Sequence, residues 1–302
     1  MEKTKWLLDT DIGNDNDDCM ALGYLLTQSN VDLLGITTVS GDSMRRAMLA
    51  DVMCRLAGKP IPVYPGCENP LIGTLLQKHM SPAEAEQVDF YPHADCLPQN
   101  RAVVFLKETI EANPYEIVLA AIGPLTNIAL LFATYPHIPG LLKSLVVMGG
   151  RYFESEACDI RKWGFIEWNI KGDPYAASIV FSAKTPSRLV IGVETSCQLK
   201  MAGERTARAI SSIPCMQPIA AVIKTWEYAW FHDALAVWAY ANQEKVHWAH
   251  GDIHVVLDNP AQFGATVFTP NEDSGCKLLT SVNVAEFFHC YASAMGFCWP
   301  QP

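Results

Sequence analysis

The amino-acid sequence predicts an α/β protein with an open, mostly parallel central sheet and helices on both of its faces. Short runs rich in valine, isoleucine and leucine alternate with stretches of helical periodicity, and this alternation is typical of parallel strands joined by crossover helices. No repeat, low-complexity tract or linker stands out in the chain. We therefore expect a single domain that spans residues 1–302.

The expected strands are seven short apolar segments. Most are nearly continuous apolar runs, as is usual for strands that are buried on both faces of a sheet. They lie at Trp6–Leu8, Val31–Val39, Ile61–Tyr64, Ile117–Ile122, Leu142–Met148, Ser187–Val193 and Ile253–Leu257.

Three helices are predicted from their end signals. Between Met44 and Leu56 the apolar residues follow helical spacing, and Gly58 stands where a C-terminal cap is expected. Asp173 is followed by a proline, which is the form of an N-cap with proline in the first turn. Asn283, with a glutamate three residues later, predicts the cap of the final helix.

Two segments do not fit a regular element. Thr74–Asn100 contains prolines and two histidines, and Tyr152–Gly172 is rich in charged and aromatic residues. Long loops in a compact domain are often lids over a site, but they are as often simple surface excursions. Both interpretations stay open at this point.

Composition and charge argue against several classes of protein. Half of the residues are apolar and 18% are charged, which is a globular composition and not a disordered one. The net charge of −10, without a cluster of lysine and arginine, argues against a nucleic-acid surface. The longest apolar stretch, Val118–Tyr135, is interrupted by glycine, proline and polar residues, so we expect no membrane span.

The N-terminal segment and the cysteines indicate the compartment. Only a few apolar residues precede the first aspartates, so the segment lacks the hydrophobic region of a secretory signal. The ten cysteines include no CxxC pair and no Cys/His cluster at zinc spacing. We therefore expect a cytoplasmic protein whose cysteines are mostly buried thiols.

The sharpest feature is the acidic segment LLDTDIGNDNDDCMAL, which follows the first expected strand and leads into an apolar helix. Five carboxylates in ten residues repel one another strongly unless a cation neutralises them. A dense set of oxygen donors suits Ca²⁺ or Mg²⁺ better than zinc. Because open α/β sheets place their ligands at strand ends, we favour a metal site over a solvated acidic turn. The aspartates are Asp9, Asp11, Asp15, Asp17 and Asp18.

Two other acidic motifs fit this segment less well. An EF-hand needs a ligand where Gly13 stands, and no glutamate closes a loop of the right length. A phosphatase of the haloacid dehalogenase type also begins with a strand and DxD, and it would use Asp9 as the nucleophile. That pattern has threonine or valine at the position of Gly13, and the rest of the chain discriminates between the alternatives.

Four further segments accompany the acidic one: GITTVSGD at Gly35–Asp42, IGPLTNIAL at Ile122–Leu130, EWNIKGDPYAA at Glu167–Ala177 and HDALAV at His232–Val237. In order and spacing the five segments resemble the inosine-uridine-preferring nucleoside hydrolase family across most of the chain. The resemblance implies a nucleoside hydrolase-like α/β fold and a bound Ca²⁺. It also implies hydrolysis of the N-glycosidic bond of ribonucleosides to free base and ribose, in purine and pyrimidine salvage.

The same resemblance implies a set of metal ligands. Asp11 corresponds to a ligand that also serves as the general base, and Asp18 corresponds to a second carboxylate ligand. The backbone carbonyl of Ile122 and the carboxylate of Asp233 complete the share of the protein. Water and the ribose hydroxyls fill the remaining positions.

The acidic loop departs from the family pattern. It is two residues longer than the usual DxDPGxDD and has Ile12 in place of proline, so either Asp15 or Asp18 is the second carboxylate ligand. We favour Asp18 because the Asp17–Asp18 pair immediately precedes the helix.

The resemblance also implies substrate contacts. Asp17, Glu167 and Asn169 correspond to positions that hold ribose hydroxyls, and His232 corresponds to the general acid that protonates the departing base. Taken alone, His232 is equally consistent with a hydrogen-bonded core histidine. Asp42 stands where asparagine is common and adds a negative charge near the expected sugar site.

Aromatic residues near these segments are candidates for stacking on a base, although aromatics at such spacing are more often core. They are Trp163, Trp168, Trp226 and Tyr228. Preference for purine or pyrimidine does not follow from them.

The expected partner is a small nucleoside, without nucleic acid or membrane, and we expect a homo-oligomer, either a dimer or a tetramer. Two functions remain as alternatives: a phosphoryl hydrolase of the haloacid dehalogenase type, and a non-catalytic homologue that binds metal or ribose.

Overall fold

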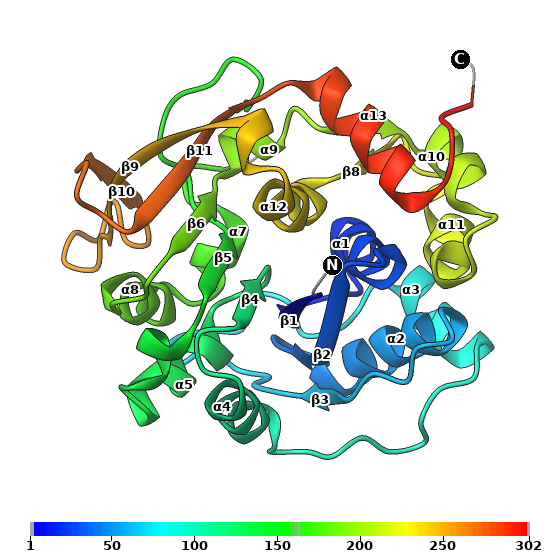
Figure 1. Cartoon of the computed structure of the whole chain (residues 1–302), viewed down its shortest axis with the longest axis horizontal. Helices are drawn as coiled ribbons and strands as arrows, with labels where there is room; N and C mark the ends of the chain where they lie inside the picture. The colour runs from blue at the N-terminus through cyan, green and yellow to red at the C-terminus, as the bar shows by residue number, and fades with distance from the viewer. Residues whose placement is uncertain (1–2, 160, 162–163, 301–302) are drawn as a thin grey trace.

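The computed structural model describes residues 3–159, 161 and 164–300, and its centre is a nine-stranded sheet (Figure 1). The strands of this sheet are β1 (Thr4–Thr10), β2 (Val31–Thr38), β3 (Val63–Pro65), β4 (Ile117–Ala121), β5 (Ser144–Met148), β6 (Arg188–Ile191), β9 (Val246–Val255), β10 (Thr266–Pro270) and β11 (Cys276–Val282). Their order is β10-β9-β11-β6-β5-β4-β1-β2-β3. All neighbours from β3 to β11 are parallel, whereas β9 is antiparallel to both β11 and β10. The predicted open, mostly parallel sheet is confirmed.

Helices cover both faces of the sheet, as Figure 1 shows. Side chains of consecutive strand residues point to opposite faces, so Trp6 and Leu8 of β1 join one apolar cluster and Leu7 joins the other. The helices are α1 (Asp17–Thr27), α2 (Ser43–Leu56), α3 (Pro82–Phe90), α4 (Ala102–Ala112), α5 (Thr126–Thr134), α7 (Trp168–Gly172), α8 (Pro174–Ser182), α9 (Val193–Ser196), α10 (Gly203–Ile210), α11 (Gln217–Ile223), α12 (His232–Ala241) and α13 (Val284–Met295).

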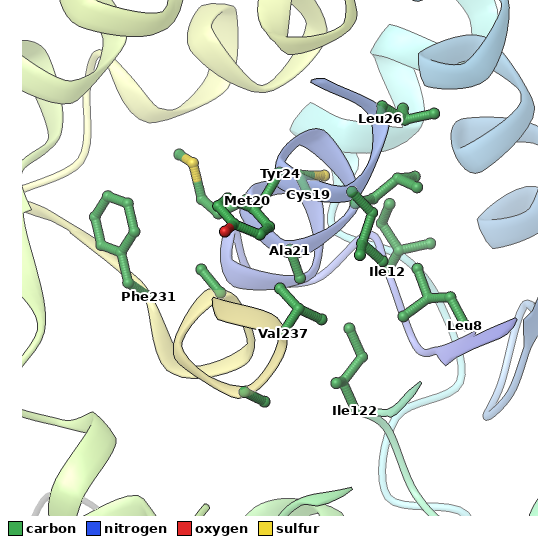
Figure 2. Packing of buried hydrophobic residues seen from close by; sticks show 14 of the residues in the cluster. Leu8, Ile12, Cys19, Met20, Ala21, Tyr24, Leu26, Ile122, Phe231 and Val237 are labelled. Carbon is green, nitrogen blue, oxygen red and sulfur yellow. The ribbon is translucent and has the colours of Figure 1, made fainter. Parts of the chain in front are cut away.

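The two faces have different helices. Helices α1, α2, α12 and α13 contribute to the cluster around Trp6 and Leu8, and α4, α5 and α8 contribute to the cluster around Leu7. Figure 2 shows α1 packed beside α12, with Ala21 and Val237 between them. This contact brings the N-terminal turns of the two helices together at the carboxyl edge of the sheet.

The predicted helix ends are confirmed. Helix α2 ends at Leu56, and Gly58 has a φ of 67°, the left-handed conformation of a helix C-terminus. The carboxylate of Asp173 accepts a hydrogen bond from the backbone of Ala176, and Asn283 caps α13 in the same way.

The outermost strands and the segment 74–100 differ from the prediction. The sequence pattern marked only residues 253–257 near β9, and it missed β10, β11 and the small antiparallel pair β7 (Lys200–Ala202) and β8 (Tyr228–Trp230). It also missed α3, which lies inside the irregular segment and begins at a Ser81 cap followed by proline. Among the described residues, no helix has the length and apolar character needed to cross a membrane.

Candidate active site

A cavity of about 300 Å³ lies at the carboxyl edge of the sheet, where β1, β4 and β5 end near the first turns of α1, α7 and α12. Nine of the ten residues predicted to form the site line this cavity, and Asp42 does not. The lining residues are Asp11, Asn14, Asp15, Asp17, Asp18, Gln77, Ile122, Met148, Glu167, Trp168, Asn169, Val193, His232 and Asp233.

Asp9 lies behind the cavity and not in its wall. Its carboxylate accepts hydrogen bonds from the Thr37 hydroxyl and from Asn127 Nδ2, the latter at 2.7 Å. Burial raises the pKa of Asp9 to about 7. Asn127 also donates to the Thr38 carbonyl at 3.0 Å, so Asp9 helps to join β1, β2 and α5. This placement argues against Asp9 as the nucleophile of a haloacid dehalogenase-type phosphatase.

A buried arginine holds the acidic loop from behind. Arg46 of α2 donates to the backbone carbonyls of Ser40, at 2.7 Å, of Ile12, at 2.9 Å, and of Asp11. Its charge partly offsets the effect of burial, which raises the pKa of Asp11. Gly13 in the same loop has a φ of 114°, which disfavours any residue with a side chain.

The loop is also joined to the segment that precedes α12. Asn16 Nδ2 donates to the carbonyl of Trp230 at 2.6 Å, and Trp230 N donates to Asn16 Oδ1 at 2.9 Å. The side-chain amide of Asn16 therefore satisfies both the N–H and the carbonyl of Trp230, as the backbone of a neighbouring strand would. Residues that are 214 positions apart in the sequence are fixed to each other directly at the site.

Three buried carboxylates come close enough to bind one ion. Asp17, Asp18 and Asp233 each offer an oxygen within 4.8 Å of the other two. Burial, followed by repulsion from neighbouring aspartates, raises the pKa of all three well above the usual range. Asp233 Oδ1 is buried and accepts no hydrogen bond from the described residues. These features fit a divalent cation with oxygen ligands.

The cluster refines the predicted set of ligands. Asp18 and Asp233 were predicted as ligands, whereas Asp17 was predicted to hold a ribose hydroxyl. Asp11 lines the same cavity, and a Cβ atom on Gly123 would lie 2.7 Å from its Oδ1. Asp15 lines the cavity outside the three-carboxylate cluster, and burial raises its pKa to about 6.

Glu167 and Asn169 are held by backbone groups. Glu167 caps α7 by accepting hydrogen bonds from the backbone of Asn169 and Ile170, at 2.9 and 3.1 Å, and from Gly150 N at 2.8 Å. Asn169 Nδ2 donates to the carbonyl of Ile122 at 2.8 Å. Both side chains line the cavity, so capping and contact with a ligand are compatible.

His232 is buried at the start of α12 and lines the cavity. Its Nδ1 lies 2.8 Å from Ser196 Oγ, and its ring stacks on Trp230 with centroids 5.6 Å apart. Ser196 Oγ also donates to the Gly192 carbonyl at 3.1 Å. The imidazole is therefore hydrogen-bonded, as a core histidine would be, and at the same time faces the site.

Asp42 and most of the aromatic candidates lie elsewhere. Asp42 is partly exposed and precedes the first turn of α2, outside the cavity lining. Of the aromatic candidates in the described part of the chain, Trp168 lines the cavity and is 47% exposed, and Trp226 and Tyr228 do not line it. Trp163 lies outside the described residues.

Sequence reasoning did not find several cavity residues: Asn14, Gln77, Met148 and Val193. Asn14 stands inside the acidic segment, and its position there was an available signal. Gln77 belongs to the segment 74–100 that was considered as a lid. Met148 and Val193 are apolar residues near strand ends, which no motif distinguishes from core residues.

The fold agrees with the comparisons with known proteins. The family model described as inosine-uridine preferring nucleoside hydrolase matches residues 6–289. Uridine nucleosidase 1 of Arabidopsis thaliana is 32% identical over 215 residues, which cover 66% of this chain and 59% of that protein. The pyrimidine-specific ribonucleoside hydrolase RihB of Escherichia coli is 30% identical over 190 residues, or 62% of this chain and 58% of that protein. The chain thus matches about three fifths of the length of these two relatives.

Solved structures share the fold. The plant nucleoside hydrolase PpNRh1 superposes with a TM-score of 0.78 at 23% identity, and 97% of this chain and 98% of that one are covered. An inosine-guanosine nucleoside hydrolase gives a TM-score of 0.77 at 22% identity, with 97% and 99% covered. Because the family model spans nearly the whole sequence, the chain belongs to the inosine-uridine preferring nucleoside hydrolase family.

Proposed function

We propose that the protein hydrolyses the N-glycosidic bond of ribonucleosides to free base and ribose, with a Ca²⁺ ion bound at the buried carboxylates. The observation that carries this proposal is the convergence of Asp17, Asp18 and Asp233 with His232 in one cavity. The cavity volume of about 300 Å³ suits a small-molecule ligand.

The charges in the cavity match those of the reaction. Cleavage of a ribosyl C–N bond builds positive charge on the sugar and negative charge on the base. Buried carboxylates stabilise the first, and a proton donor stabilises the second. When bound, the cation supplies a polarised water and binds hydroxyl groups of the sugar. A low-dielectric, buried setting strengthens each of these interactions.

Each residue has a proposed task. Asp11 takes a proton from the attacking water, and Asp18, Asp233 and the Ile122 carbonyl are ligands of the ion. The position of Asp17 in the carboxylate cluster makes it a ligand or a partner of the ribose hydroxyls that bind beside the ion. His232 protonates the departing base.

The identity of the donor atoms determines which cation we propose. All are oxygen atoms, which excludes a preference for soft metals. Several carboxylates and a carbonyl with room for hydroxyl ligands suit the larger, flexible coordination shell of Ca²⁺ better than the octahedral shell of Mg²⁺.

The test is a screen of ribonucleosides for released ribose, with and without a chelator. We expect ribose from inosine or uridine, and we expect its loss on chelation and its return with Ca²⁺. The Asp18→Asn variant is expected to be inactive. Asp273→Asn, which changes an exposed aspartate far from the carboxylate cluster in sequence, is the matched control. Ribose binding without turnover by the wild type would favour the non-catalytic alternative, and phosphate release from phosphate esters would favour a phosphatase.

A further inference from the structure

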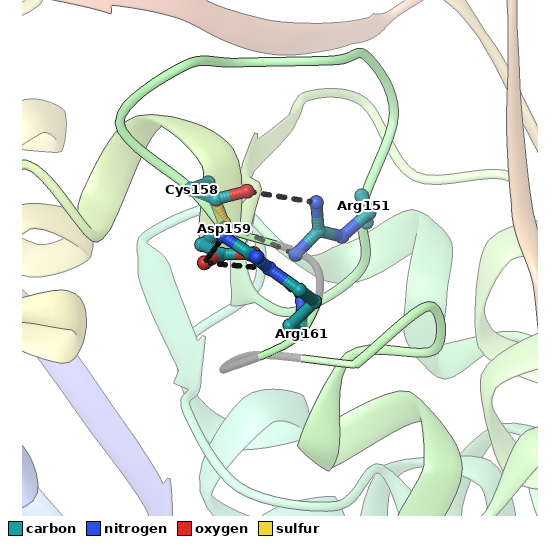
Figure 3. Close-up of polar contacts among 4 residues, drawn as sticks. All are labelled: Arg151, Cys158, Asp159 and Arg161. Carbon is teal, nitrogen blue, oxygen red and sulfur yellow. Dashed lines mark hydrogen bonds and ion pairs between the residues drawn. The ribbon is translucent and has the colours of Figure 1, made fainter.

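A second cavity, of about 820 Å³, is lined by the segment that follows β5 and by the start of β10. Arg151, Cys158 and Arg161 are among its lining residues. Figure 3 shows the guanidinium group of Arg151 directed at Cys158, with the Asp159–Arg161 ion pair beside it. The proposed hydrolysis makes no use of this thiol.

Cys158 is in contact with a cation and with a second thiol. Arg151 Nη2 donates to Cys158 Sγ at 3.1 Å, and Arg151 Nη1 donates to the Cys158 carbonyl at 3.4 Å. Cys197, which follows α9, packs against Cys158 and Val193 in a small buried cluster. Its sulfur is 3.4 Å from the carbonyl of Ala157, the residue before Cys158.

The surroundings of Cys158 differ from those of the other buried thiols, including Cys197, whose pKa is raised by its hydrogen bond to Cys158 and by burial. A hydrogen bond from the Cys197 thiol, together with the charge of Arg151, lowers the pKa of Cys158 to about 7. Asp159 acts in the opposite direction, but Arg161 binds its carboxylate at 2.8 Å. Burial instead raises the pKa of Cys215 and of Cys276 to about 11. Thiolate is the nucleophilic form of cysteine.

We propose that Cys158 and Cys197 form a dithiol that hydroperoxides oxidise to an intramolecular disulfide. The Cys158 sulfur attacks the O–O bond of hydrogen peroxide, an S–O bond forms, and the leaving hydroxide takes up a proton to become water. The Cys197 sulfur then attacks Cys158, so that the S–S bond forms, the S–O bond breaks and a second water leaves. Two thiols are oxidised for each peroxide reduced.

The cavity and the arginine point to this chemistry and not to a purely structural pair. Cys158 is only 3% exposed, so bulky thiol reagents have poor access to it, but it lines a cavity that admits small molecules. The positive charge of Arg151 stabilises the thiolate form of Cys158. Cys197 is already in contact and needs no large displacement to react.

The pair is linked to the candidate active site through α9. Val193 of this short helix lines the active-site cavity, and Ser196, next to Cys197, contacts His232. The S–S bond is shorter than a contact between two thiols, so we expect a small shift at the end of α9 that reaches Ser196, the partner of His232. This consequence for activity rests on the proposed function, whereas the thiol chemistry does not.

The test treats the full chain with one equivalent of hydrogen peroxide at pH 7. We expect the loss of two thiols, a mass lower by two hydrogen atoms, and a cross-linked peptide that contains Cys158 and Cys197. The lowered pKa of Cys158 gives it a larger thiolate fraction at this pH than an ordinary cysteine has. Lower intrinsic nucleophilicity offsets part of this gain, and we expect Cys158 to be oxidised before the exposed Cys96.

Variants separate the two sulfurs. Cys197→Ser is expected to stop at a sulfenic acid on Cys158, which dimedone traps, and Cys158→Ser is expected to lose the fast reaction. Cys276→Ser is the matched buried control and is expected to behave as wild type. Arg151→Gln keeps both thiols and is expected to slow the reaction, which preserves the test if a cysteine variant fails to fold.

Two outcomes would overturn the proposal: oxidation of Cys96 or Cys298 before Cys158, or a wild-type peptide map without the Cys158–Cys197 link. The activity arm compares ribose release before and after oxidation. A reductant-reversible loss in wild type but not in Cys158→Ser supports the link to α9, and full activity of the disulfide form contradicts that link. If no nucleoside is hydrolysed at all, the mass and thiol measurements still decide the chemistry.

Discussion

The side-chain amide of Asn169 donates a hydrogen bond to the backbone carbonyl of Ile122 at 2.8 Å. A residue predicted to hold the sugar thus contacts the carbonyl predicted to hold the metal ion. A carbonyl oxygen has two lone pairs, so this contact leaves one for a cation and fixes the direction in which it points. Asn169 therefore belongs to the support of the metal site as well as to the cavity wall.

We expect Asn169→Ala to weaken Ca²⁺ binding, because the Ile122 carbonyl loses the group that orients it. Loss of such a supporting contact typically costs about 10- to 100-fold in metal affinity. Calorimetric titration of the metal-free protein with Ca²⁺ measures the effect. Asn259→Ala, at an exposed residue, is the control. Equal affinity in the two variants would show that Asn169 does not support the ion.

Removal of the cation is expected to lower the thermal stability of the wild type. An ion that binds only the folded state stabilises it by about 2.7 kcal/mol when its free concentration is 100 times its Kd. Melting curves recorded over a series of Ca²⁺ concentrations test this expectation. A melting temperature that does not change between chelator and saturating Ca²⁺ would contradict a folded-state metal site.

Replacement of Asp11 by Asn should be far more damaging to ribose release than replacement of Asp15. Asp11 is proposed both to bind the ion and to take a proton from water, and Asp15 lies outside the three-carboxylate cluster. Steady-state kinetics and Ca²⁺ titration of both variants provide the measurement. If Asp15→Asn loses the ion while Asp18→Asn keeps it, the assignment of the second ligand to Asp18 is wrong.

His232→Ala is expected to reduce kcat/KM on inosine or uridine by about 10²- to 10⁴-fold, the usual contribution of general acid catalysis. A p-nitrophenyl riboside releases p-nitrophenolate, a stable anion that needs no proton, so hydrolysis of this substrate should be nearly spared. The ratio of the two losses is the measurement. If His232 only supports the fold, its removal would lower kcat/KM equally for both substrates. That result would exclude the acid role.

Glu84 predicts a pH dependence of stability. Its carboxyl is buried in α3 with Oε2 bonded to Ser81 Oγ at 2.6 Å, and burial raises its pKa to about 8. The folded state binds this proton more tightly than the unfolded state, so the stabilisation is complete below about pH 4.5 and is lost as pH rises toward 8. The maximum slope for one group is about 1.4 kcal/mol per pH unit.

The Glu84→Gln variant is expected to lack this component, since an amide carries no proton to lose. Denaturant unfolding at pH 5 and pH 8, with Glu86→Gln as an exposed control on the same helix, measures the difference. Parallel pH profiles for wild type and Glu84→Gln would mean that the Glu84 carboxyl does not hold its proton in the folded state.

The fold was predictable wherever burial is complete. Strands β4 and β5 are buried along their whole length, so their sequences are nearly continuous apolar runs. Strand β9 lies near the edge of the sheet and mixes buried and exposed residues. Its histidines and tryptophan interrupt the apolar run by which a strand is recognised in the sequence. Helix α3 buries only Glu84 and Val88, which leaves almost no apolar periodicity.

The site was predictable where chemistry is concentrated in the sequence. The aspartates of the acidic loop stand out by residue type alone, whereas His232 and Asp233 were identified through the resemblance of the segment HDALAV to the family. Gln77 and Val193 reach the cavity only because distant segments pack beside it, and no local pattern records that. The sugar role predicted for Asp42 stays a prediction. Asp42 precedes α2 and lies outside the cavity lining.

The pairing of Asn16 with Trp230 makes the site sensitive to chemical ageing. The Asn16 amide donates to the carbonyl of Trp230 through its NH₂ group and accepts from the Trp230 N–H through its oxygen. Spontaneous deamidation would replace the donor by a carboxylate oxygen, which repels that carbonyl and adds one more negative charge to the acidic loop. Deamidation of Asn16 during storage at high temperature or high pH would therefore separate the acidic loop from the start of α12, with no change in the length of the chain.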